Sequence, residues 1–142
     1  MRIYEESIRV PLEMRGPGIP QGVNVSDLTI NADLAPTIVD VANANPGLVM
    51  DGRSLIGVAQ NPGIERGRQL LIEEPIFKAI RTERYMYAEH NTGERELYDV
   101  QKDPFELVSR HNAPAYASVK AQLATRLHEL QNCAGSSCLA HP

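Results

Sequence analysis

Residues 70–100 read LLIEEPIFKAIRTERYMYAEHNTGERELYDV, and this stretch decides the fold. Short runs rich in branched and aromatic side chains alternate here with turn-forming residues, as is typical of strands joined by tight connections. Asn91-Thr92-Gly93-Glu94 supplies hairpin chemistry before the last run. The stretch therefore predicts an antiparallel meander with strands over 70–72, 76–82, 85–90 and 95–100.

A helix is predicted after the meander. Asp103-Pro104 ends the last strand, and Asn112-Ala113-Pro114 combines a capping side chain with a proline suited to a first helical turn. Apolar side chains then recur at spacings of three and four, which places them on one helical face. They are Tyr116, Val119, Leu123, Leu127 and Leu130. This stripe is long enough to cover one face of the meander.

The chain before the meander carries weaker patterns. Residues 3–14 alternate, with Ile8 and Leu12 on one face, and this favours a half-buried strand. Pro11 lacks the N–H that a strand needs for pairing, so the strand is expected at a sheet edge or to bulge there. Residues 23–30 alternate again and predict a short strand or an extended arm.

A second helix is predicted to follow this arm. Asn31 or Asp33 can cap it, and Pro36 fits a first turn. Its apolar residues, Leu34, Ile38 and Val41, recur at helical spacing. The segment 43–47 is rich in turn-forming residues and is predicted to end the helix. Residues 50–68 are predicted to be a long connection.

Composition narrows the classes of partner. The net charge of −4 comes from mixed signs spread along the chain, with no basic block that could neutralise phosphates, so nucleic acid is not an expected partner. No apolar stretch approaches the roughly 18 to 20 residues that span a bilayer, and the N-terminus lacks the apolar core of a signal peptide. A membrane is therefore not an expected partner either, and the sequence leaves the localisation open.

Both cysteines, Cys133 and Cys138, lie near the C-terminus in a Gly- and Ser-containing turn that allows a disulfide. The loop-closure model gives about 2 kcal/mol for so short a ring. Free thiols are the alternative. A zinc site is less favoured, because it would need further ligands and only His128 and His141 are near in sequence.

The other reactive side chains favour structural roles. Glu5 and Glu6 would point to opposite faces of the predicted strand and so could not act as an acid and base pair. Arg9 is expected to form an ion pair with Glu6 or Asp33 rather than to bind a ligand. The histidines show no metal-ligand or catalytic spacing and are interpreted as surface residues. They are His90, His111, His128 and His141.

Three phrases resemble the sulfatase family of the alkaline phosphatase superfamily. The first is YEESIRVPL at 4–12 with RGPG at 15–18. The second is DLAPTIVD at 33–40 with MDGRSL at 50–55, and the third is ELYDV at 96–100 with KDPFEL at 102–107. In this order and at these spacings they resemble the C-terminal portion of a sulfatase, over nearly the whole chain.

The resemblance also implies what this portion would lack. The family's nucleophile is a Cys or Ser in a Cys/Ser-x-Pro-x-Arg motif, converted to formylglycine beside a divalent cation, usually calcium. No such motif occurs in the 142 residues, and neither Cys133 nor Cys138 fits it. The resemblance therefore implies no catalytic residue and no metal ligand here, with calcium and formylglycine expected only in the full-length protein.

The combined expectation is an α+β chain. Residues 69–142 are predicted to be a C-terminal subdomain in which a small antiparallel sheet is packed by the last helix. Residues 1–68 are predicted to be a remnant of the catalytic α/β domain, supplying a strand and a helix from its edge. The expected function is that of a sulfuric ester hydrolase fragment, inactive by itself. A phosphonate or phosphate monoester hydrolase fragment, or a non-catalytic scaffold, is the alternative.

The first half would leave apolar faces uncovered, so a partner is expected. The two candidates are the missing N-terminal sulfatase half and a second copy of the chain.

Overall fold

The structure is a computed structural model that describes residues 2–64 and 67–139. The chain forms two compact units. One, called here the sheet unit, comprises Met1–Pro11 and Gln69–Asn132. The other, called the α2 unit, comprises Leu12–Arg68 and Cys133–Pro142. These two units are defined by which residues lie close together in space. The domain boundary predicted between residues 68 and 69 refers instead to the resemblance to a family, and it stays a prediction.

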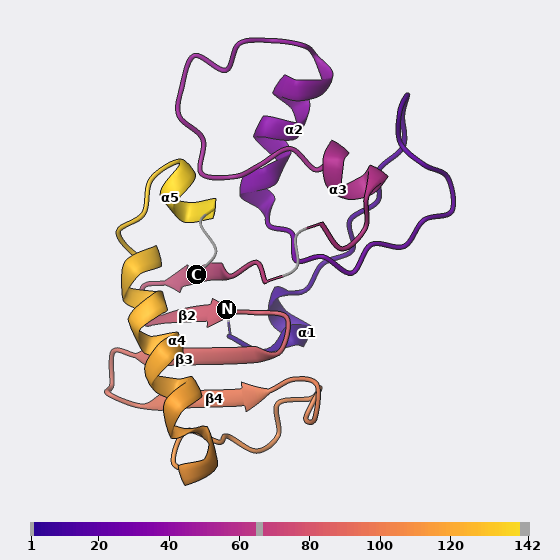
Figure 1. Cartoon of the computed structure of the whole chain (residues 1–142). Helices are drawn as coiled ribbons and strands as arrows, with labels where there is room; N and C mark the ends of the chain where they lie inside the picture. The colour runs from indigo at the N-terminus through magenta and orange to yellow at the C-terminus, as the bar shows by residue number, and fades with distance from the viewer. Residues whose placement is uncertain (1, 65–66, 140–142) are drawn as a thin grey trace. The chain divides into compact units, whose positions relative to one another are not determined.

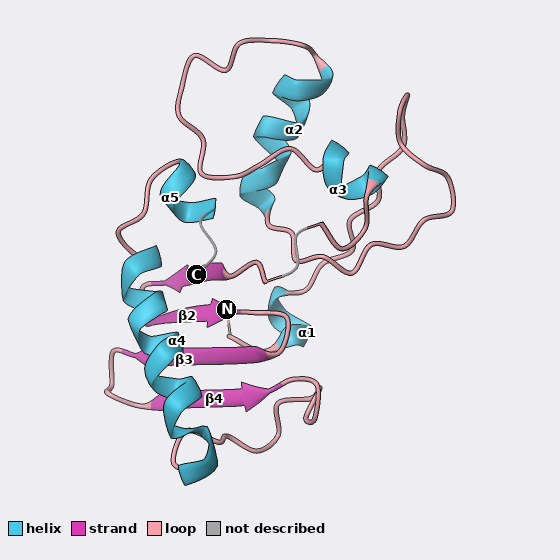
Figure 2. Cartoon of the chain, viewed as in Figure 1, coloured by secondary structure: helices cyan, strands magenta, loops and turns pink. Residues whose placement is uncertain are grey.

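The predicted meander is confirmed (Figures 1 and 2). Four antiparallel strands lie in chain order: β1 (Leu70–Glu74), β2 (Phe77–Arg81), β3 (Tyr85–His90) and β4 (Arg95–Asp99). Ala79 pairs with Ile72 on one side and with Ala88 on the other, and Ala88 pairs in turn with Glu96. This register sets which side chains share each face of the sheet.

The predicted C-terminal helix is confirmed as α4 (Ala117–Leu130), which a 3-10 turn, η2 (Pro114–Tyr116), precedes. Figure 1 shows α4 lying across the strands. Its stripe is buried at Leu123, Leu127 and Leu130. Two polar contacts fix the ends: the Tyr116 hydroxyl donates to Asp99 at 3.3 Å, and His128 Nε2 lies 3.1 Å from Glu89 Oε2.

The opposite face of the sheet carries Ala79 and Ala88, and the N-terminal segment covers it. Ile3 is buried there in one apolar cluster with Phe77, Ala79, Met86, Ala88 and Tyr98. Tyr4 and Ile8 pack against the same cluster. The sheet is thus enclosed between α4 and the first residues of the chain.

The strand predicted over residues 3–14 is wrong. A short helix, α1 (Glu5–Ile8), forms instead, and no strand lies among the described residues before β1. Contacts far along the chain explain the difference: the Glu5 N–H donates to Glu106 at 2.7 Å, and Arg81 binds the Glu5 carboxylate at 2.6 Å. Local alternation cannot reveal either partner.

The second predicted helix is confirmed as α2 (Leu34–Val41), which follows the 3-10 turn η1 (Asn31–Asp33). Residues 23–30 form no strand, which leaves the extended arm that the sequence also allowed. A short helix, α3 (Ile56–Gln60), interrupts the predicted connection, and α5 (Ser136–Leu139) follows the sheet unit. No helix in the described part of the chain has the length and apolarity needed to cross a membrane.

One buried ion pair orders the α2 unit. Both oxygens of Asp33 accept hydrogen bonds from the Arg68 guanidinium at 2.7 Å, and the Arg53 and Ile30 N–H groups donate to the same carboxylate. Burial acts to raise the pKa of Asp33, but these hydrogen bonds outweigh it and hold the pKa below its usual value. Asp33, one of the two partners expected for Arg9 beside Glu6, is paired with Arg68.

Candidate functional site

The main polar site of the sheet unit surrounds the Glu96 carboxylate. One of its oxygens accepts hydrogen bonds from the Tyr98 hydroxyl and, at 3.3 Å, from the Tyr4 hydroxyl. The other oxygen lies 2.6 Å from His90 Nε2. Tyr4, His90, Glu96 and Tyr98 are called here the Glu96 cluster. It joins the ends of two strands to the residue just before α1.

Local geometry brings these residues together. The β3–β4 hairpin turns over 91–94, so His90 and Glu96 lie near each other on one face of the sheet. Tyr98 follows two positions after Glu96 and therefore shares its face. Its ring meets the Tyr4 ring edge-on, with the centroids 6.1 Å apart.

The tyrosines of the cluster stay protonated at neutral pH. Burial, followed by the hydrogen bond to Glu96, raises the pKa of Tyr98 far above its usual value. Burial and the nearby Glu96 charge also raise the pKa of Tyr4. Both hydroxyls therefore remain donors, and neither is activated as a base or a nucleophile.

Two hollows adjoin the cluster. One, of about 230 Å³, has an apolar wall that includes Ile76 and Phe77 and a polar rim at His90 and Glu96. The other, of about 320 Å³, is lined by Ser109 and other polar groups. The Ser109 hydroxyl accepts the Leu97 N–H at 3.1 Å. Ser109 Oγ also lies 3.2 Å from His111 Nδ1, and both residues line this hollow. This chemistry can hold a hydroxyl-bearing group by hydrogen bonds.

The loop after β4 is built around two acidic residues. Asp103 accepts the N–H groups of Leu107 and Val108 at 3.1 and 2.9 Å. Glu106 has a φ of 53° and turns its buried side chain toward the N–H of Glu5. Burial raises the pKa of Glu106, and its second oxygen has no hydrogen-bond partner among the described residues. The KDPFEL segment at 102–107 therefore has a structural role, in shaping the turn after β4.

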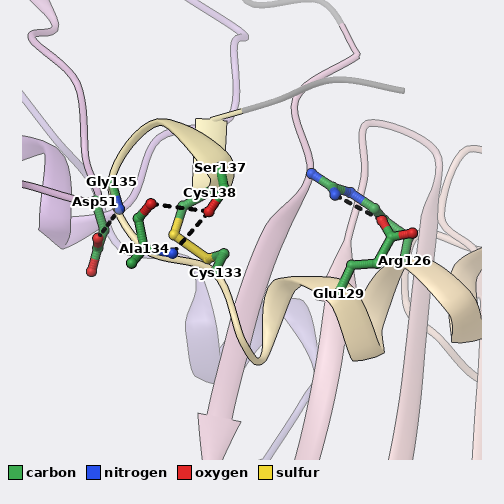
Figure 3. The surroundings of a disulfide bond; sticks show 8 residues. All are labelled: Asp51, Arg126, Glu129, Cys133, Ala134, Gly135, Ser137 and Cys138. Carbon is green, nitrogen blue, oxygen red and sulfur yellow. Dashed lines mark hydrogen bonds and ion pairs between the residues drawn. A yellow bond between two sulfur atoms is a disulfide. The ribbon is translucent and has the colours of Figure 1, made fainter.

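The structure joins Cys133 and Cys138 in a disulfide, with the Cα atoms 5.0 Å apart (Figure 3). Within the ring, the Ala134 N–H donates to the Ser137 hydroxyl, which donates back to the Ala134 carbonyl. The Gly135 N–H donates to Asp51 at 2.6 Å, which ties the ring to the rest of the α2 unit. The disulfide thus constrains the chain locally.

The remaining predicted residues are dispersed. Glu5 binds Arg81, while Glu6 and Arg9 are exposed. His128 is exposed as predicted, but His90 is half-buried in the Glu96 cluster, which sequence reasoning missed. His111 is half-buried too, with its Nδ1 3.2 Å from Ser109 Oγ, so it is not the surface residue that was predicted. His141 lies outside the described residues. The missed signal was the hairpin itself, because a turn over 91–94 brings residues 90 and 96 together.

The described residues do not fit the calcium site of the family. Over 2–64 and 67–139, no group of three or more His, Cys, Asp or Glu side chains is arranged to hold a metal ion. The buried carboxylate of Asp33 is already saturated by Arg68 and two backbone N–H groups.

Comparisons with known proteins place this chain in a family. The family model described as N-sulphoglucosamine sulphohydrolase, C-terminal, matches residues 1–133. A choline-sulfatase of Rhizobium meliloti is 33% identical over 124 residues, which are 80% of this chain and 23% of that protein. An ulvan-active sulfatase of Formosa agariphila is 26% identical and is covered over 27% of its length. The chain thus spans about a quarter of these relatives.

Solved structures agree with this placement. BT4656, solved in complex with its substrate D-glucosamine-2-N,6-O-disulfate, has a TM-score of 0.69 at 28% identity, over 80% of this chain and 26% of that one. The phosphonate monoester hydrolase SpPMH from Silicibacter pomeroyi has a TM-score of 0.66 at 26% identity, over 84% and 28%. The chain therefore belongs to the sulfatase family and corresponds to its C-terminal region.

Proposed function

We propose that this chain is the C-terminal part of a sulfuric ester hydrolase and that it braces the enzyme without catalysing hydrolysis by itself. The observation that carries the proposal is the family match over residues 1–133, together with the absence of a Cys/Ser-x-Pro-x-Arg motif from all 142 residues. Formylglycine and calcium belong, in this proposal, to the part of the enzyme that this chain does not contain.

The sheet unit suits a bracing role. Its sheet is packed on both faces, and several of its polar groups are engaged with one another: Glu96 with Tyr4, Tyr98 and His90, and Asp99 with Arg84 at 2.9 Å. Such satisfied networks make a fold rigid. The Glu96 cluster would then hold the segment that leads into α1 in one position against the sheet.

Complementation tests the proposal. The upstream portion of the Rhizobium meliloti choline-sulfatase, ending where its match to this chain begins, is produced with and without the chain. Hydrolysis of choline sulfate in the presence of calcium is then measured. We expect little activity from either part alone and a gain when both are present. Hydrolysis by the chain alone, or no gain in the mixture, contradicts the proposal.

A phosphonate monoester hydrolase fragment is the second candidate, and the likeness to SpPMH favours it. The same experiment with the upstream portion of SpPMH and a phosphonate monoester substrate separates the two. A larger gain with the choline-sulfatase portion supports the sulfatase assignment. A larger gain with the SpPMH portion reverses it.

A further inference from the structure

The smaller of the two hollows beside the Glu96 cluster is called here the Ile76 hollow. Its apolar wall includes Ile76 and Phe77, its polar rim includes His90 and Glu96, and residues 2–4 complete the lining. Every lining residue belongs to the sheet unit. Its volume of about 230 Å³ exceeds the roughly 150 Å³ that suffices to hold a benzene ring inside a protein. The hollow therefore has the size for one ring with a small substituent.

The apolar wall suits an aromatic ring. Ile76, in the turn before β2, is 61% exposed, whereas Phe77 beside it is 1% exposed. Tight turns favour glycine, proline and small polar residues, so the turn itself does not require a branched aliphatic side chain. The Phe77 and His90 rings lie 5.8 Å apart and are inclined by 54°. The hollow thus combines an aliphatic side chain with ring surfaces, against which an aromatic ligand packs well.

The polar rim keeps one open hydrogen-bond acceptor. A carboxylate offers about four lone-pair sites, and it can only accept. Glu96 uses three of them, two for the Tyr4 and Tyr98 hydroxyls on one oxygen and one for His90 Nε2 on the other. Its side chain is 20% exposed, so a ligand in the hollow can reach it. A ligand that fits this rim therefore brings a donor.

The charges around the hollow select a neutral donor. Arg2 also lines it and adds a positive charge, which disfavours an ammonium ligand. A carboxylate or sulfate ligand would meet the Glu96 charge and would bring no donor for it. A sugar brings several hydroxyl groups that each need a partner, but the hydroxyls of the two tyrosines are already engaged with Glu96. One hydroxyl group on an apolar ring meets all of these conditions.

We propose that the Ile76 hollow is a binding site for a small phenol. The ring packs against Ile76 and Phe77, and the hydroxyl group donates to the open lone pair of Glu96. A phenolic hydroxyl with an ordinary pKa near 10 is neutral at pH 7, so it keeps the proton that this hydrogen bond needs. The proposal concerns binding by the chain itself and does not depend on the proposed function.

Titration of the 15N-labelled chain with 4-methylphenol tests the ligand chemistry. We expect saturable shifts of the amide signals of Phe77, His90 and Glu96. Toluene should bind at least tenfold more weakly, because it leaves the Glu96 acceptor without a donor. Benzylamine and benzoate, which carry the disfavoured charges, should also bind at least tenfold more weakly. Equal affinity for toluene, or shifts that map outside the hollow, would overturn the proposal.

Two variants test the place of binding. Ile76→Asp puts a charge on the apolar wall and should weaken 4-methylphenol binding at least tenfold. Leu107→Asp is the matched control, because Leu107 is 77% exposed in the sheet unit and does not line the hollow. Both changes are at exposed positions, and the amide spectrum of each variant verifies its fold. Unchanged affinity in Ile76→Asp, or the same loss in the control, would show that the phenol does not occupy the Ile76 hollow.

Discussion

Asp33 shows how a single buried carboxylate orders a segment poor in regular structure. Its side chain is 0% exposed and holds Arg68, 35 positions away, together with two backbone N–H groups. A buried pair of this kind stabilises little relative to apolar residues of the same shape. Removing one partner, however, leaves an uncompensated buried charge, so the pair fixes where η1 and α2 begin.

Arg68→Ala is therefore predicted to destabilise the α2 unit by about 3 to 5 kcal/mol. The physical reason is that the Asp33 carboxylate stays buried without its cation. Urea unfolding and amide exchange of the α2 N–H groups measure the change. Arg15→Ala, at an exposed position of the same unit, is the control and should change stability by less than about 0.5 kcal/mol. Equal effects of the two variants would contradict this account.

Glu106 is predicted to make stability depend on pH. Because burial raises its folded-state pKa above the unfolded value, the folded state binds the proton more tightly. The stability that Glu106 contributes is therefore fully present below the unfolded pKa, about 4.3, and is lost as pH rises through the folded pKa. Glu106→Gln should shrink the difference in unfolding free energy between acidic and neutral pH. An unchanged difference would exclude this role.

At the scale of elements, α4 and the sheet share most of the buried apolar residues of the sheet unit. Leu127 is 0% exposed on α4, and Ile80, Tyr87 and Leu97 are buried in the sheet. Burial and the hydrogen bond to Glu89 raise the pKa of Tyr87 to about 12, so its hydroxyl stays a donor. The helix and the strands therefore stabilise each other.

Leu127→Ala is predicted to lower the free energy of unfolding of the sheet unit by about 2 to 5 kcal/mol, because it leaves a cavity under α4. Leu107→Ala is the control for the same change at an exposed side chain. Thermal unfolding followed by circular dichroism compares them. A cost for Leu127→Ala no greater than that of Leu107→Ala would show that α4 does not hold the sheet.

The disulfide is predicted to act locally. Replacing both Cys133 and Cys138 by Ser should cost about 2 kcal/mol within the ring, because the closed loop is short. The exchange of the Gly135 N–H, which donates to Asp51, should then speed up by about 30-fold. The melting of α4 should stay unchanged. A large loss of α4 stability would mean that the ring supports more than the tail.

Local patterns predicted the elements whose partners lie nearby in sequence. The four strands follow one another through short turns, and η2 and α4 together carry the apolar stripe from Tyr116 to Leu130. The sequence could not predict α1, because Glu5 finds its partners at Arg81 and Glu106. The Glu96 cluster was missed for a related reason: Tyr4 joins it from 92 positions away.

At the scale of the whole molecule, the chain carries the packed sheet unit and an α2 unit with an uncovered apolar face. Its match to the sulfatase family covers nearly all of its length but only about a quarter of each of the relatives compared. The proposed function of such a region is to contribute surface and rigidity, with the chemistry carried by other residues of the enzyme. The nucleophile motif of the family is absent from its sequence.

The most direct test is an assay of the purified chain with a chromogenic aryl sulfate in the presence of calcium. We expect the purified chain to release no phenol above a buffer control. An intact sulfatase, assayed alongside, should release the phenol readily. Turnover by the chain that rises in proportion to its concentration and survives repurification would contradict the account, because the 142 residues would then contain a catalytic centre of their own.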